Sequence, residues 1–124
     1  MSAKKQVTLI ATIALGASLS NSVNLIQDIV GPDKPFRLFG IDVPSSWTTA
    51  NLAIYQKHAD GTYKVVKDEY GNEMTLVANA GGCIRFANPS KFASLTDIKI
   101  LSGSTAVPVN QAAERDLTLV LREI

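Results

Sequence analysis

The chain has 124 residues, of which 46% are apolar and 19% charged, as in an ordinary globular domain and unlike a disordered segment. Twelve basic and eleven acidic residues give a net charge of +1, without the basic excess that nucleic-acid-binding proteins use to contact phosphates. The single cysteine, Cys83, excludes an intramolecular disulfide framework and favours a reducing compartment. No apolar run is long enough for a membrane-spanning helix. We therefore expect one domain over residues 1–124, with neither nucleic acid nor membrane among its partners.

The N-terminal segment allows two interpretations. Lys4 and Lys5, followed by an apolar stretch and small residues, have the layout of a signal peptide. The apolar residues alternate with polar ones, however, which is the period of a β-strand. Those on the shared face are Val7, Leu9, Ala11, Ile13 and Leu15. We favour the strand, with residues 1–6 as a flexible arm and with Lys4 and Lys5 as candidate contacts to another protein.

A proline-rich loop at residues 31–35 precedes the next predicted strand. Residues 37–43 alternate again, so Phe39, Ile41 and Val43 are expected on one face of a half-buried strand that Pro44 ends.

Trp47 is the only tryptophan and lies in a Ser/Thr-rich segment between two predicted strands. One interpretation buries the ring at one end of the fold, with the indole N–H bonded to a carbonyl. The other makes the ring a stacking platform for a sugar or a partner protein. We favour burial, because large aromatic side chains are mostly buried, and keep Trp47 as a candidate interface residue.

Three β-rich runs between residues 51 and 78 are separated by Asp60-Gly61 and Gly71-Asn72. Such dipeptides supply the positive φ that two-residue hairpin loops require, so this region is expected to be an antiparallel meander. Tyr63 and Val65 alternate with Lys64 and Val66, which leaves this strand apolar on both sides.

Further short strands are expected at residues 83–87, 97–101 and 116–122, with a single helical turn after Asn88 and a long connection over residues 102–115. A connection of that length is usually functional or crosses between sheets. No amphipathic helical run separates the strands, so parallel βαβ architecture is disfavoured. The expected fold is all-β: an antiparallel β-sandwich, jelly-roll-like, of about eight short strands.

Catalytic and metal-binding chemistry has little support in the residues. His58, the only histidine, is expected at an exposed hairpin tip without a partner that would make it a base. Cys83 is expected to be a small packed residue rather than a nucleophile. The carboxylates Asp68, Glu69 and Glu73 lack the ligand spacing of a calcium loop and suit a charged turn. We expect no enzyme activity, metal or cofactor.

Six segments of the sequence carry a family resemblance: residues 43–52 (VPSSWTTANL), 68–73 (DEYGNE), 92–95 (FASL), 98–103 (IKILSG), 108–113 (PVNQAA) and 117–120 (LTLV). They resemble a group of small β-rich proteins encoded among the structural genes of tailed bacteriophages. The similarity covers most of the chain from about Leu9 onward, and residues 31–37 depart from it as an insertion.

The resemblance implies a virion component, a capsid decoration or cement protein of jelly-roll type that stabilises the shell of the major capsid protein. It implies self-association as a homodimer or homotrimer, assembly in the host cytoplasm and no catalytic residues. One alternative is a neck, tail or head-fibre component of the virion. Another is an exported carbohydrate-binding sandwich that uses Trp47 as its platform.

Overall fold

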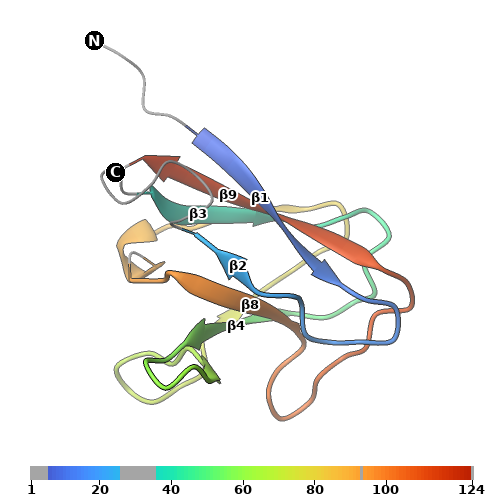
Figure 1. Ribbon diagram of the computed structural model, residues 1–124. Helices are drawn as coiled ribbons and strands as arrows, with labels where there is room; N and C mark the ends of the chain where they lie inside the picture. The colour runs from blue at the N-terminus through green and yellow to red at the C-terminus, as the bar shows by residue number, and fades with distance from the viewer. Residues whose placement is uncertain (1–5, 26–35, 93, 124) are drawn as a thin grey trace.

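The computed structural model describes residues 6–25, 36–92 and 94–123 of the chain, and they form two antiparallel sheets packed face to face (Figure 1). Its strands are β1 (Gln6–Ile13), β2 (Val23–Asn24), β3 (Phe36–Asp42), β4 (Leu52–Lys57), β5 (Tyr63–Val65), β6 (Thr75–Leu76), β7 (Cys83–Arg85), β8 (Asp97–Ser102) and β9 (Arg115–Glu123). A 3-10 turn, η1 (Pro89–Phe92), precedes β8. The expected all-β sandwich is therefore confirmed.

The strand order identifies the fold as a jelly roll. One sheet has the order β1-β9-β3-β7 and the other β2-β8-β4-β5, with β6 also paired to β4. Strands of the first half of the chain thus pair with those of the second half in reverse order: β1 with β9, β2 with β8, β3 with β7 and β4 with β5. This long antiparallel ribbon is rolled so that β9 also pairs with β3 and β8 with β4.

The core lies between the sheets and is filled by the inward face of each strand. Alternation along a strand sends every second side chain inward, so Leu117, Leu119 and Leu121 of β9 are fully buried, as predicted. The largest fully buried side chains are Ile13, Leu25, Leu38, Ile41, Leu52, Ile54, Ile98, Ile100, Leu117, Leu119, Leu121 and Gln111. Phe92 and Leu95 close one end of this core from η1 and the residues after it.

The N-terminal segment is a strand, as predicted. All eight residues of β1 pair with β9, and Ala11 and Ile13 are fully buried. Leu15 departs from the expected face: it lies beyond the strand end and is 70% exposed. Gln6 already pairs with Arg122, so the boundary predicted for the arm, residues 1–6, is wrong by that residue. Lys4 and Lys5 lie outside the described residues.

A β-bulge in β3 corrects the predicted face of Phe39, whereas Ile41 and Val43 are buried as predicted. Leu38 pairs with Leu121 and Gly40 with Val120, so Phe39 is the extra residue. The bulge shifts the alternation by one, which puts Leu38 rather than Phe39 in the core. Phe39 instead lies on the outer face, 5.5 Å below the guanidinium of Arg122.

The expected meander is also corrected. β5 and β6 both pair with β4, one after the other along the same edge, and residues 67–73 form a separate hairpin between them. The turns at residues 59–61 and 69–71 are three-residue loops rather than two-residue loops. In each, the amide of the glycine donates to the carbonyl three residues earlier, and Gly61 and Gly71 take φ values of +87° and +82°.

Candidate functional site

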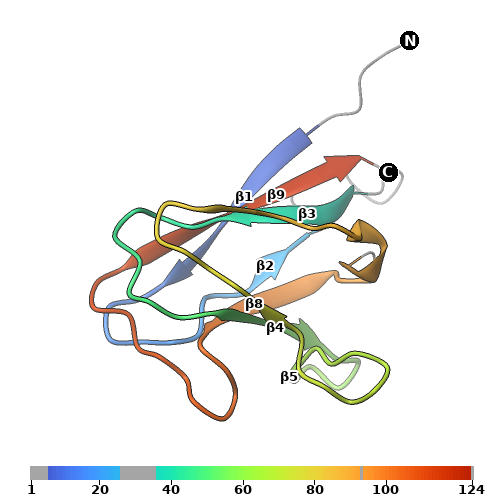
Figure 2. The ribbon, with the colours of Figure 1, turned by 180° about the vertical axis from the view of Figure 1, so that it is seen from behind.

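Four connections gather at the end of the sandwich that lies away from the start of β1 and the end of β9 (Figure 2). We call this surface the loop end; it consists of residues 14–22, 43–51, 77–82 and 103–114. Main-chain hydrogen bonds join the four segments, for example from Gly81 N to Pro44 O at 3.0 Å and from Gly103 N to Asn51 O at 2.7 Å. The long connection after β8 crosses from one sheet to the other, as expected.

Gln111 is the centre of this loop end. Its side chain is 1% exposed although it is polar. Its amide nitrogen donates to Thr48 O at 3.1 Å and to Ser102 Oγ at 2.8 Å, and its amide oxygen accepts from Thr48 N at 2.9 Å. Its main chain exchanges bonds with Gly16 and Ala17. A fully bonded buried polar group of this kind holds the segments around it in one arrangement.

Trp47 lies in the same end and is 5% exposed. Its indole N–H donates to Ala50 O at 3.0 Å. This is the buried arrangement favoured from the sequence, with a carbonyl as the partner. It leaves almost no ring surface for stacking, so Trp47 is not the contact residue or sugar platform considered above.

The loop end presents apolar side chains to solvent. Leu15, Val77 and Val107 are 70%, 68% and 68% exposed and lie on three different segments of it. Val107 is held in a tight turn, because Ser104 N donates to Val107 O and Val107 N donates to Ser104 Oγ. Exposed apolar residues on braced loops are suited to contact with another protein.

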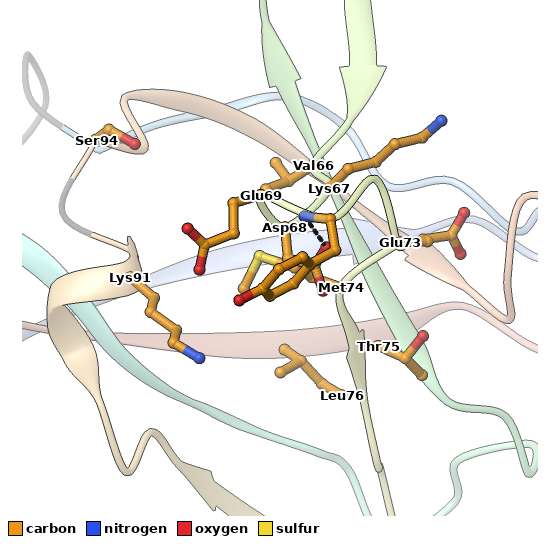
Figure 3. A pocket seen from close by; sticks show the side chains of 11 residues that line it. Val66, Lys67, Asp68, Glu69, Glu73, Met74, Thr75, Leu76, Lys91 and Ser94 are labelled. Carbon is orange, nitrogen blue, oxygen red and sulfur yellow. Dashed lines mark hydrogen bonds between the residues drawn. The ribbon is translucent and has the colours of Figure 1, made fainter.

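A hollow of about 540 Å³ lies beside the 67–73 hairpin, between it and η1 (Figure 3). Val66, Met74 and Leu76 contribute apolar surface and are partly buried against the core. Glu69 and Lys91 bring opposite charges to its lining, and Tyr70, at 82% exposure, stands at the tip of the hairpin. The arrangement is a mixed surface depression without a convergent set of reactive groups.

Two carboxylates of the 67–73 hairpin, Asp68 and Glu73, form hydrogen bonds within the protein. Asp68 Oδ1 accepts from Tyr70 N at 2.9 Å and from Asn72 N at 3.0 Å, which shapes the turn. Glu73 accepts from the main chain and hydroxyl of Thr105, which ties the hairpin to the loop end. Within the described ranges, no three His, Cys, Asp or Glu side chains are grouped as metal ligands.

His58 lies at the start of the 58–62 hairpin and is exposed, as predicted. The nearby Asp60 carboxylate accepts from the hydroxyl and the amide of Thr62 at 2.7 and 3.0 Å. The hydroxyl bond is the main cause that lowers the pKa of Asp60. Asp60 therefore serves the turn rather than orienting His58.

Cys83 was predicted to be packed, and this was wrong: the residue is exposed on edge strand β7. The alternation places Ile84, not Cys83, against the core. Beside it, Arg85 forms an ion pair with Asp42 at 2.7 Å, and this hydrogen bond raises the pKa of Arg85.

Sequence reasoning missed two polar arrangements. The Gln111 centre has no periodic signal, because Gln111 lies in a connection rather than a strand. On the outer face of the second sheet, Tyr63 Oη donates to Asp97 Oδ1 at 2.8 Å while Lys99 Nζ lies 4.5 Å from the Tyr63 ring. The sequence marked Tyr63 as part of a strand apolar on both sides, but not its partners.

Comparison with known proteins gives no relative: no family model, curated protein or solved structure matches this chain. No helix among the described residues is long and apolar enough to cross a membrane.

Proposed function

We propose that this chain is a non-enzymatic structural protein of a tailed-phage virion, a decoration or cement protein that binds the shell of the major capsid protein. The observation that carries the proposal is the loop end, where Leu15, Val77 and Val107 are exposed on segments joined by main-chain hydrogen bonds. Gln111 links the segments of Leu15 and Val107 to Thr48. The resemblance of the sequence to small phage structural proteins supplies the class of partner. Jelly rolls occur in viral capsid domains, and this likeness is an analogy of fold.

Ordered loops and a repeated shell both favour binding of this kind. Loops that are already ordered lose little conformational entropy when they dock, so a modest apolar contact yields more net affinity. On a shell of repeated subunits, each small contact is multiplied by the number of sites, which stabilises the whole particle.

The first test is the composition of particles released by cells that produce this protein. Quantitative mass spectrometry of purified particles should find the chain in a fixed ratio to the major shell subunit. A few copies per particle would instead favour a neck, tail or head-fibre component. Absence of the chain from the particles would contradict a virion role.

The second test addresses the loop end. Val107→Asp should weaken binding of the purified chain to particles that lack it roughly tenfold or more, because it adds a charge to an apolar contact. Tyr70→Asp is the matched control, since Tyr70 is also highly exposed, at 82% against 68% for Val107, but lies on the 67–73 hairpin. Equal loss of binding in both variants would contradict the assignment of the contact to the loop end.

A further inference from the structure

Among the residues that the structure describes, strand β1 is an edge strand of its sheet. Its partner on one side is β9. The hydrogen bonds of Thr12 show which main-chain N–H and C=O groups of β1 point to the other side. Thr12 N donates to Asn21 Oδ1 at 2.8 Å, and Thr12 O accepts from Asn21 N at 3.1 Å, so these groups face away from β9. Main-chain direction alternates along a strand, so those of Gln6, Thr8 and Ile10 face the same way. Within the described residues, no protein group pairs with these three.

This edge lacks the features that usually prevent pairing with another chain. β1 has eight residues, while the other edge strands β2, β5, β6 and β7 have two, three, two and three. β7 carries the Arg85–Asp42 ion pair and β5 carries Lys64, whereas β1 contains no charge, proline or glycine. Long, uncharged edge strands pair readily with further strands.

The side chains of β1 also show an incompletely covered edge. Ala11 and Ile13 are fully buried, but Val7 and Leu9, on the same inward face, are only partly buried. On the outward face Ile10 is 46% exposed. Another strand beside residues 6–10 would cover these apolar groups.

We propose that residues 6–10 of β1 pair antiparallel with the same residues of a second copy of this chain, about a two-fold axis at Thr8. In this register Thr8 faces Thr8 and Gln6 faces Ile10, so outward main-chain groups meet each other and form about six hydrogen bonds. Val7 lies opposite Leu9 of the second copy, and both belong to inward faces. The segment is self-complementary and uncharged, as an isologous contact requires. The four-stranded sheet of one copy and that of the other copy then form one continuous sheet across the dimer.

Sedimentation of the full chain over a dilution series tests the dimer. The wild-type chain should dimerise at high concentration and dissociate on dilution. Thr8→Pro should be monomeric and still folded by circular dichroism, because it removes a donor that faces away from β9. Ile10→Lys should also be monomeric, because it places a charge on the edge strand. It replaces Thr8→Pro as the test variant if the proline variant unfolds. Thr118→Lys is the matched control, since Thr118 pairs with Ile10 one strand further from the edge, and it should remain dimeric.

Cysteine cross-linking in a Cys83→Ser background tests the register. Thr8→Cys should form a disulfide-linked dimer on oxidation, because facing Cα atoms in such a pair are about 5.5 Å apart, within disulfide range. Gln6→Cys and Ile10→Cys should cross-link when mixed but not alone. A wild-type chain that is monomeric at its highest soluble concentration would overturn the proposal. A dimer that persists in both Thr8→Pro and Ile10→Lys would also overturn it. So would a dimer that cross-links through Gln6→Cys alone, because that requires a different register. All measurements use the isolated chain, so this dimer and the virion role can fail separately.

Discussion

Gln111 and Thr48 exchange two hydrogen bonds across 63 positions of the chain: Thr48 N donates to Gln111 Oε1 at 2.9 Å, and Gln111 Nε2 donates to Thr48 O at 3.1 Å. The pair joins the connection between β3 and β4 to the connection between β8 and β9. Each of these connections crosses from one sheet to the other, so the pair ties together the two crossings at the loop end.

Gln111→Leu should lower the free energy of unfolding by about 3 kcal/mol or more, measured by urea denaturation. Leucine has a similar volume, but it leaves the buried Ser102 hydroxyl and the part-buried Thr48 N and Thr48 O without their partner. An unpaired group costs about 1–3 kcal/mol when it is buried and less when it is part-buried. Asn110→Leu, at the exposed neighbouring position, is the matched control and should stay within about 0.5 kcal/mol of wild type. A loss no larger than that of the control would refute the central role of Gln111.

The fluorescence of Trp47 reports whether its ring is buried. Because it is the only tryptophan and is 5% exposed, its fluorescence should be blue-shifted and poorly quenched by iodide in the native chain. Trp47→Phe should cost about 1 kcal/mol or more of stability, since it removes the hydrogen bond to Ala50 O and part of the buried ring. Emission near that of free tryptophan would contradict the buried position.

The sequence predicts most of this fold because each strand has a local signal. Alternating apolar residues identified β1 and β9, and the Asp60-Gly61 pair identified a turn. The bulge at Phe39 was not predictable in this way, because the residue types in β3 carry no local signal for it. Only the register of β3 against β9 reveals the extra residue. The same holds for the loop end: the partners of Gln111 are distant in sequence and depend on how the sheets are stacked.

Gly40→Ala should destabilise the fold by about 2–3 kcal/mol or more in thermal or urea unfolding. A Cβ at position 40 would lie 2.3 Å from Ile84 O, where β3 approaches β7 beside the bulge. The side chain of Arg85 also lies close, at 2.9 Å, but it can move away. Arg85→Ala should therefore not rescue Gly40→Ala, and a full rescue would show that the side chain rather than the carbonyl excludes alanine.

Tyr63 should make the fold sensitive to alkaline pH. The hydrogen bond that its phenol donates to Asp97, followed by desolvation, raises the pKa of Tyr63 above its usual value. A group with a raised folded-state pKa stabilises the fold fully below its unfolded-state pKa, about 10 for tyrosine, and loses that contribution as the pH rises through the folded value. Wild type should therefore exceed Tyr63→Phe in stability at about pH 8, and the difference should shrink above about pH 10. Denaturation of both proteins at the two pH values measures this, with phenolate absorbance to follow ionisation.

Tyr70→Phe, at an 82% exposed side chain, is the control at the lower pH and should match wild type. A difference between wild type and Tyr63→Phe that stays constant or grows with pH would show that the phenol–carboxylate bond does not stabilise the sheet.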